Sequence, residues 1–345
     1  MGIEKGLGAA ALACAMGLTA SAGPPADDLT DFLRRDIRLS NADLSALERG
    51  EAVTKAIGTR EKREIELFAA VRIDAARQQF VDAFRDITHF KRGDAVLAIG
   101  LFSDPPSLDD VAALTANDEE LADLKKCRTG DCAFKLAESR INELRAFDWS
   151  APDARARVEQ LVRFRLVEYL QSYQRDGSDA LAVYADRRYR TAVAGELHAV
   201  LRASPSLYGY TPELERYLRD YPRATLDGTS SLLYWAKEKF GLKPTVNTYH
   251  VVFYQRADRP GVSLIASKQI YASHYFEAGL EVFSLVDHPG GRGTYLFYLG
   301  RSRADALRGS FGGLKKSIVQ GRALAGLKNA MASIRSRFAG GAPRG

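Results

Sequence analysis

Two ionisable side chains interrupt an otherwise apolar strand face in the last third of the chain. Along the run 262–276 the even positions are apolar except for Lys268 and His274. The odd positions are mostly Ser, Gln and Tyr, including Tyr271. If the even face points at the C-terminal helix, both ionisable groups lie in an apolar cavity, where burial demands a partner or shifts their proton affinities.

Two further residues extend this set. His250 lies in the preceding strand-like run, and Arg301 lies at the end of the last strand-like run. Such a group could bind an anionic head group or perform acid–base chemistry. The alternative is that Lys268 lies at a sheet edge and each histidine is a structural residue with satisfied hydrogen bonds. Two histidines are weak evidence for a metal site, and we expect neither a metal nor another cofactor.

Three known catalytic or nucleotide-binding motifs are missing from the sequence, so they do not indicate a reaction. The sequence has no Gly-x-Ser-x-Gly elbow, no phosphate-binding loop with Lys and Ser/Thr, and no His-Glu-x-x-His. The glycine-rich run at 290–293 lies between two strand-like runs and is typical of a hairpin turn.

The elements that must position these residues are a meander and a helix. Short apolar runs separated by turn residues predict antiparallel strands, which we place at Thr245–Gln255, Val262–Tyr275, Leu280–Val286 and Thr294–Leu299. One long helix is expected over Ala304–Phe338. Its apolar positions, Leu314 and Ile318 among them, mostly recur every three or four residues. Such a stripe needs a sheet to cover, and a curved sheet leaves a pocket beside a straight helix, which these two residues would line.

The earlier chain supplies more strands and a helical insertion. Strands are expected at Glu51–Gly58, Glu64–Ile73 and Val96–Phe102, with a helix at Ala75–Ile87. The predicted organisation is a signal peptide, an N-terminal part, a helical insertion, a meander with its helix, and a disordered tail, at 1–22, 23–136, 137–243, 244–338 and 339–345. The last helix of the insertion is expected to begin at Thr229 or Ser230.

The N-terminus has the pattern of a secretory signal. A short charged start is followed by the apolar stretch Gly6–Leu18 and by Ala20-Ser21-Ala22, the small-x-small form that signal peptidase cleaves. The alternative is an uncleaved anchor, although about 13 apolar residues is short for a membrane span. We therefore expect an exported, periplasmic protein.

Only Cys127 and Cys132 remain in the expected mature chain. In an exported protein an even pair favours a disulfide, and Thr129-Gly130 can form the turn between them. A redox pair and half of a metal site are the alternatives. Four intervening residues are too many for the usual redox spacing, and two further metal ligands are not apparent.

The C-terminal segment is strongly basic. Residues 306–345 hold eight Lys or Arg and no acid, in a chain of net charge +6. A solvated helix face explains this charge, as does peripheral contact with an anionic lipid surface or an acidic partner. Nucleic acid is not expected as a partner, because no aromatics are interleaved with these residues.

The order of elements is similar to the helix-grip fold of START-like domains. The resemblance covers 50–136 and 244–338, and the insertion has no counterpart in the small members. It implies an α+β fold in which a curved antiparallel sheet grips a long C-terminal helix around an apolar cavity. The runs Ser267–Tyr271 and Leu299–Arg303 resemble uncharacterised bacterial exported proteins, which implies no activity.

Two main hypotheses follow from this resemblance. The first is an exported binding protein for a lipid or another hydrophobic or anionic small molecule, held between the sheet and the C-terminal helix. The second is an enzyme of unknown reaction in the same cavity, with His250 or His274 as the base and Lys268 or Arg301 stabilising an anion. A structural envelope protein that docks by its basic helix is a third.

Overall fold

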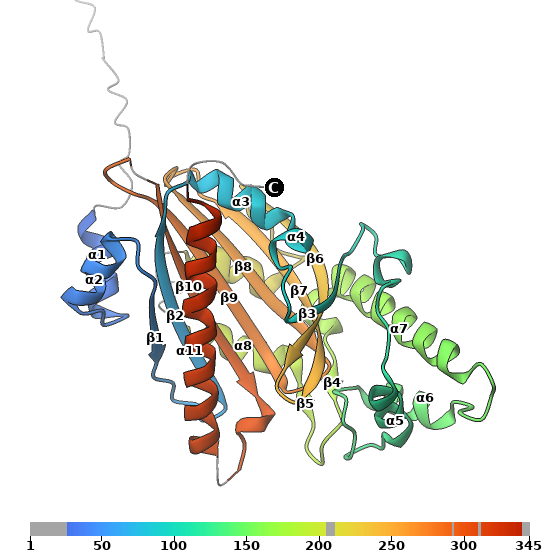
Figure 1. The fold of residues 1–345 in the computed structure, drawn as a ribbon. Coiled ribbons are helices and arrows are strands. Elements are labelled where there is room, and N and C mark those ends of the chain that lie inside the picture. Colours follow the sequence, from blue (N-terminus) through green and yellow to red (C-terminus); the bar gives the residue numbers. More distant parts are fainter. Residues whose placement is uncertain (1–25, 205–210, 292, 310–311, 340–345) are drawn as a thin grey trace, which may run out of the picture.

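A large, twisted antiparallel sheet forms the centre of the computed structural model (Figure 1). The structure describes residues 26–204, 211–291, 293–309 and 312–339. The predicted signal segment 1–22 and residues 340–345 of the predicted tail lie outside this part.

Eight strands form the sheet in the order β1-β2-β10-β9-β8-β7-β6-β3, all antiparallel to their neighbours. The strands of this sheet are β1 (Val53–Ile57), β2 (Glu64–Ile73), β3 (Val96–Leu101), β6 (Thr229–Phe240), β7 (Lys243–Gln255), β8 (Val262–Ala272), β9 (Phe276–Asp287) and β10 (Thr294–Ala304). A separate two-stranded ribbon pairs β4 (Val183–Tyr184) with β5 (Thr191–Ala192).

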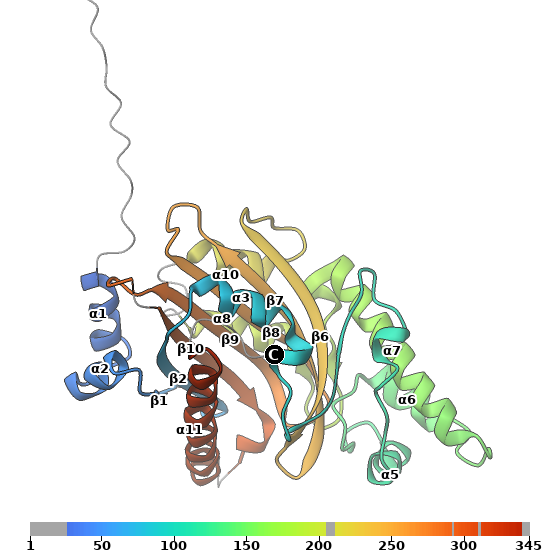
Figure 2. The ribbon, with the colours of Figure 1, turned by 45° about the horizontal axis from the view of Figure 1, so that its top comes forward.

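Helices cover both faces of the sheet. They are α1 (Ala26–Arg35), α2 (Asn41–Glu48), α3 (Arg77–Arg85), α4 (Ile87–Phe90), α5 (Asp118–Lys126), α6 (Glu138–Ala146), α7 (Ala154–Asp176), α8 (Val193–Arg202), α10 (Pro212–Asp220) and α11 (Gly312–Arg337). In Figures 1 and 2, α11 and α3 lie in front of the sheet, whereas α8 and α10 lie behind it. We call the first side the α11 face and the second the insertion face.

The α11 face is closed by aromatic and aliphatic side chains. Phe80 and Phe84 of α3 pack with Met331 and Phe338, from the last third of α11 and just beyond it, against strand residues such as Phe283. Burying each such side chain is worth roughly 1.5–3 kcal/mol. This cluster therefore fixes α3 and the C-terminal end of α11 on the sheet.

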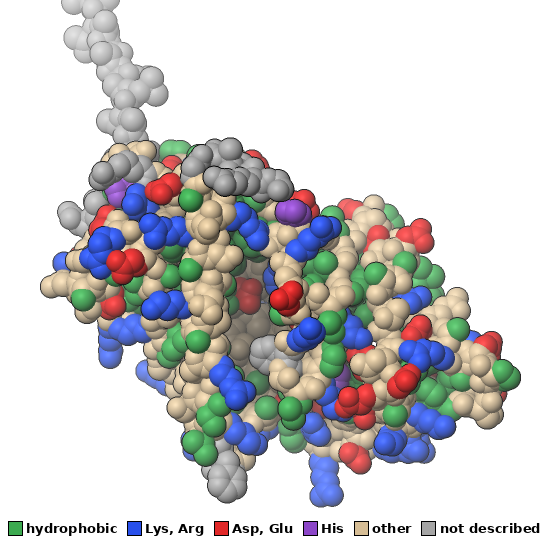
Figure 3. Space-filling model, viewed as in Figure 1, with side chains coloured by type: hydrophobic (Ala, Val, Ile, Leu, Met, Phe, Trp, Pro, Cys, Tyr) green, Lys and Arg blue, Asp and Glu red, His purple; other side chains and the backbone are tan. Residues whose placement is uncertain are grey.

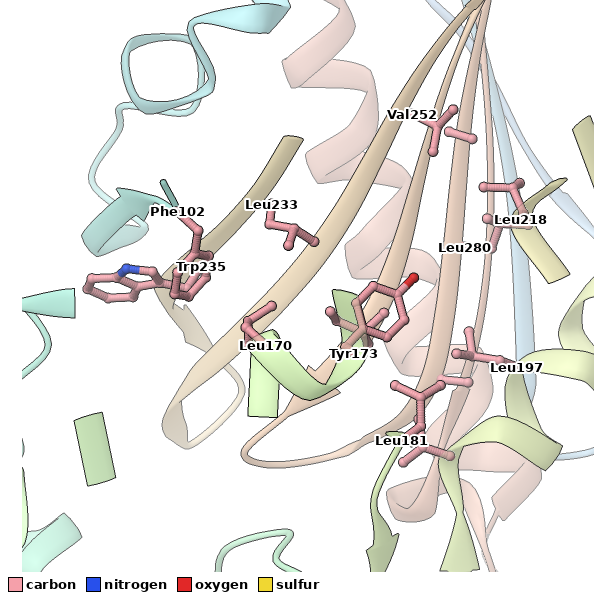
Figure 4. Packing of buried hydrophobic residues seen from close by; sticks show 14 of the residues in the cluster. Phe102, Leu170, Tyr173, Leu181, Leu197, Leu218, Leu233, Trp235, Val252 and Leu280 are labelled. Atoms are coloured by element: carbon pink, nitrogen blue, oxygen red, sulfur yellow. The ribbon is translucent and has the colours of Figure 1, made fainter. Parts of the chain in front are cut away.

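The insertion face carries the larger cluster. Leu170 and Tyr173 project from α7 toward the strands that carry Leu233 and Val252, and Trp235 lies nearby on β6 (Figure 4). Trp235 is fully buried and donates a hydrogen bond from Nε1 to the Asp110 carbonyl oxygen at 2.9 Å. The insertion is thus bound to the sheet by a continuous apolar core.

The predicted fold class is confirmed. The four C-terminal strands form the expected meander, a long helix follows them, and a mainly helical segment interrupts the chain between β3 and β6. Cys127 and Cys132 form a disulfide inside a small apolar cluster with Leu124, Ile141 and Val158.

One predicted helix is wrong. Residues 229–240, expected to end the insertion as a helix, form β6, which pairs with β7 on one side and β3 on the other. Leu233 and Trp235 are buried on the insertion face, and Tyr234 and Ala236 on the α11 face. A strand buried on both faces shows no apolar–polar alternation, so its periodicity does not reveal it.

Candidate functional site

A β-bulge in β8 sets which side chains face the insertion. Thr248 is opposite Tyr271, but the next residue, Tyr249, is opposite Gln269, so Ile270 is the extra residue. Such a bulge shifts the alternation of side chains by one position. Lys268 and Ile270 consequently lie on the insertion face together with Tyr271. Strict alternation would place Tyr271 on the opposite face.

A cavity of about 420 Å³ lies beside this bulge, between the sheet and the helices α5, α6 and α7. Most of its wall is apolar and comes from α7, α6 and the segment after the disulfide. The apolar lining includes Leu124, Phe134, Leu144, Leu161, Val162, Leu166 and Val246. A cavity of this size and composition is typical of a site for a small apolar molecule.

Three tyrosines form the sheet end of the cavity. Tyr169 and Tyr184 each lie against Tyr271, with ring centroids 6.0 and 6.3 Å away. Tyr169 Oη donates to the Ile270 carbonyl oxygen at 2.7 Å, and Tyr184 Oη accepts from the Ala272 amide at 3.3 Å. These two hydroxyls therefore satisfy backbone groups beside the bulge.

Tyr271 differs from its two neighbours. In contrast to Tyr169 and Tyr184, its hydroxyl has no hydrogen-bond partner among the described residues. Desolvation raises the pKa of this phenol, so it is neutral. A neutral phenol can donate one hydrogen bond and accept another. Tyr169 already donates its proton and Tyr184 already accepts a hydrogen bond, whereas both functions of the Tyr271 hydroxyl remain available to a ligand at this end of the cavity.

Charged residues of α6 and α7 form another part of the cavity wall. Arg140 and Arg165 both pair with Glu143 and Glu168, with Nη1–Oε2 at 3.0 Å for Arg165–Glu168 and Nη2–Oε2 at 2.7 Å for Arg140–Glu168. The Arg165 hydrogen bond lowers the pKa of Glu143. These charges are mutually compensated, so they join two helices without giving the cavity a strong net charge.

A buried cationic residue lies next to the cavity on the same face. Lys268 is 1% exposed, and its Nζ donates to the Leu218 carbonyl oxygen at 2.9 Å. The same Nζ lies 5.1 Å from the ring centroid of Tyr173, whose hydroxyl is 2.9 Å from Nδ1 of His250. Leu218 is in the last turn of α10, where backbone carbonyls carry partial negative charge.

Burial governs the protonation of this pair. It lowers the pKa of Lys268 to about 7 and, together with the charge of Lys268, lowers the pKa of His250 to about 3. His250 is therefore neutral at physiological pH, and its Nε2 has no hydrogen-bond partner among the described residues. Neither residue lines the cavity. The expectation that Lys268 faces the C-terminal helix is wrong, since its face is covered by the insertion.

His274 and Arg301 are also not among the residues that line the cavity. His274 Nδ1 is 2.8 Å from the Ser273 hydroxyl, its ring is tilted against Phe134 with centroids 4.6 Å apart, and burial lowers its pKa to about 4. Arg301 is buried between the carboxylates of Glu64 and Glu66. Arg301 is thus held by two carboxylates, whereas His274 Nε2 has no hydrogen-bond partner among the described residues.

Leu314 and Ile318, the two predicted helix contacts, are exposed at 66% and 49%. The reason is helix geometry. Ile318 and Leu327 are nine residues apart, which is about 900° of rotation and places them on opposite sides of the helix. Because Leu327 packs toward the sheet, Ile318 points away from it. The predicted stripe is thus two separate stripes on opposite sides of α11.

The α11 face has its own polar cluster, and Figure 3 shows this face hollowed beside α11. Lys91 Nζ lies 5.5 and 5.2 Å above the stacked rings of Tyr234 and Tyr249 and 3.6 Å from Glu238 Oε1. Burial raises the pKa of Glu281, which is hydrogen-bonded to Tyr298. Gly300 leaves room for this phenol, because a Cβ there would lie 2.3 Å from Tyr298 Oη.

Sequence reasoning missed the contribution of α7 to the cavity. Tyr169 and Tyr173 are four residues apart on an apolar face of α7, a pattern that by itself is typical of helix packing. Their spacing brings both phenols to one side of α7, one at the cavity and the other at His250. Two hydroxyls on a buried stripe need buried partners, and that requirement is the signal that could have revealed the site.

Comparisons with known proteins give limited information. No protein-family model matches the chain, and the search of curated proteins found no relative. Among solved structures, the chain is similar to the Zhui aromatase/cyclase from a Streptomyces species, at 14% sequence identity and a TM-score of 0.22. That match covers 39% of this chain and 90% of the other. The assignment below therefore depends on the geometry of this chain.

Proposed function

We propose that this protein binds a hydrophobic small molecule in the cavity between α7 and the end of β8. The observation that carries the proposal is an apolar cavity of about 420 Å³ in which Tyr271 has a hydroxyl without a described partner. Apolar walls with a few placed polar groups are how proteins hold such ligands in a fixed orientation.

The energetic argument is simple. Each Å² of apolar ligand surface removed from water contributes roughly 25 cal/mol, and one hydrogen bond to Tyr271 adds about 1 kcal/mol and fixes which end of the ligand enters first. The proposed site is on the insertion side, and not beneath the C-terminal helix as the helix-grip resemblance implied. The acid–base alternative has no equivalent support, because His250, Lys268 and His274 are not among the lining residues.

A cavity-filling substitution tests the proposal. Ser172 lines the cavity from α7, and Ser172→Trp should occupy much of it. We expect the affinity for a fluorescent fatty-acid probe to fall at least about tenfold, because filled volume excludes the ligand. Titration of probe fluorescence, with circular dichroism to confirm the fold, measures this.

Two tryptophan substitutions serve as controls. Gln160→Trp is on the same helix but on its exposed side, and Ile318→Trp is on the exposed side of α11. Both should bind the probe as the wild type does. If Ile318→Trp abolishes binding while Ser172→Trp does not, the ligand site is beside α11 and the proposal is wrong.

Tyr271→Phe tests the orientation of the ligand. Removing the hydroxyl should weaken a fatty-acid probe about fivefold, the value of one hydrogen bond, and leave a probe without a polar end unaffected. Tyr169→Phe provides the contrast, since its hydroxyl already bonds to Ile270 and its loss should reduce stability instead. Equal weakening of both probes by Tyr271→Phe would contradict the proposed role.

We also propose export with cleavage near Ala22. The support is the N-terminal pattern together with the Cys127–Cys132 disulfide. Intact-mass analysis of the protein from a periplasmic fraction, with and without reductant, should show the shortened chain and a gain of two hydrogens on reduction. A full-length chain confined to the cytoplasm would contradict export.

A further inference from the structure

The helix α11 has two different sides. Leu327, Met331, Ile334 and the following Phe338 pack toward the sheet. The opposite side of its N-terminal half carries Leu314 and Ile318, four residues apart and therefore on one side of the helix. Leu314, Ile318 and the adjacent Val319 are 66%, 49% and 37% exposed. Here we call the surface formed by these three residues, Lys315 and Arg322 the outer face of α11.

The charge of this helix has one sign. Residues 312–337 contain six basic side chains and no acid, and the basic residues are Lys315, Lys316, Arg322, Lys328, Arg335 and Arg337. None of them forms an ion pair with an acid in the described part of the chain. Three of them donate instead to neutral oxygens, at Thr59, Arg49 and Phe90. The positive charge around the outer face is therefore not neutralised at close range.

Hydrophobic and basic side chains occur together on the outer face of α11. In Figure 3 green and blue side chains lie side by side over the lower, N-terminal half of α11. Exposed aliphatic groups flanked by Lys and Arg on one helix face are the pattern of a helix that lies in a membrane interface. No helix in the described part of the chain is long and apolar enough to cross a bilayer, so contact of this kind would be peripheral.

We propose that the outer face of α11 docks on an anionic lipid surface. Leu314, Ile318 and Val319 enter the boundary between head groups and acyl chains, while Lys315 and Arg322 contact lipid phosphates. Charge complementarity decides between occupants. A second copy of the chain would bring the same basic face against itself in a symmetric dimer, and like charges would oppose it. An anionic lipid surface instead neutralises the positive charge of this face.

Vesicle binding by the full chain tests the proposal. The protein should co-sediment with vesicles of phosphatidylcholine containing about 30% phosphatidylserine, and only weakly with phosphatidylcholine alone. Raising NaCl from about 0.1 to about 0.5 M should release it, because salt screens exposed charges. Leu314→Ser/Ile318→Ser and Lys315→Glu/Arg322→Glu should each reduce the binding constant at least about tenfold.

Matched controls separate this face from the general surface. Leu97→Ser/Val183→Ser removes exposed apolar residues elsewhere, and Lys125→Glu/Lys126→Glu makes the same charge change on α5. Both should bind vesicles as the wild type does. Equal loss in the controls, no binding to either vesicle, binding to DNA but not to vesicles, or a dimer that the outer-face substitutions dissociate would each overturn the proposal. Probe binding to the α7 cavity should not change in any of these variants.

Discussion

Two lysines on opposite faces of the sheet, Lys268 and Lys91, have different partners. On the insertion face Lys268 has only a backbone oxygen and an aromatic ring for partners, and burial lowers its pKa to about 7. On the α11 face Lys91 has a carboxylate, Glu238, within 3.6 Å and two tyrosine rings beneath it. Lys268 is thus buried without a carboxylate, whereas Lys91 keeps one close to its amine.

The difference follows from what covers each face. Helices α7, α8 and α10 lie across the insertion face and share a continuous apolar core with it. On the opposite side, α11 buries large apolar side chains only near its C-terminal end, because its apolar residues lie on two sides. A long helix therefore covers a sheet only along the part of its length where its apolar side chains face that sheet.

The largest expected effect is on the free energy of unfolding, and it is seen by comparing an apolar residue of the insertion with one on α11. Leu170 is fully buried on α7, and Leu170→Ala should lower the free energy of unfolding by about 2–5 kcal/mol through lost burial and a cavity. Leu314→Ala on the outer face of α11 should change it by less than about 0.5 kcal/mol. Urea unfolding followed by circular dichroism measures both. A similar loss in the two variants would mean that α11 is packed on both of its sides.

The next effect is the pH dependence of stability from Lys268. Its pKa falls from the usual 10.5 to about 7 on folding, so between these values the unfolded state binds more protons and wild-type stability rises with pH. Lys268→Met should be more stable than the wild type at pH 7, by up to a few kcal/mol, and the advantage should shrink toward pH 10.

Urea unfolding of both proteins at pH 7 and pH 9.5 measures this change, with the exposed Lys125→Met as a control that should show no pH-dependent difference. A stability difference that is the same at both pH values would show that Lys268 titrates normally. The insertion face would then not exclude water from this amine.

A smaller effect of opposite sign is expected from Glu281 on the α11 face. Burial raises the pKa of this carboxyl, so the folded state binds more protons and stability falls as pH rises above about 4.5. Glu281→Gln should be slightly more stable than the wild type at pH 7 and equal to it at pH 4. If the glutamine variant is less stable at pH 7, an ionised Glu281 paired with Lys91 stabilises the fold.

The meander was predictable because it obeys simple rules. Its strands are bounded by turn residues, and their limits were predicted to within five residues at most, with the C-terminal end of β10 the least well placed. The strand β6 was not predictable in the same way. It is buried on both faces, so Leu233, Tyr234, Trp235 and Ala236 form a continuous apolar run.

The faces of the site residues were harder to predict than the elements. A one-residue bulge at Ile270 brings Tyr271 to the insertion face beside Lys268, and no turn or glycine marks it in the sequence. The pairing of α7 with β8 is equally non-local, since Tyr169 and Ile270 are 101 residues apart. Local periodicity cannot specify either feature.

Hydrogen–deuterium exchange with and without a bound fluorescent fatty acid tests the central claim most directly, because it reports where the ligand slows local opening. The account predicts slower exchange in Ala154–Asp176 and at the bulged end of β8, with Gly312–Arg337 unchanged. Slower exchange confined to α11 and the strands beneath it, with α7 unaffected, would contradict a ligand site on the insertion face.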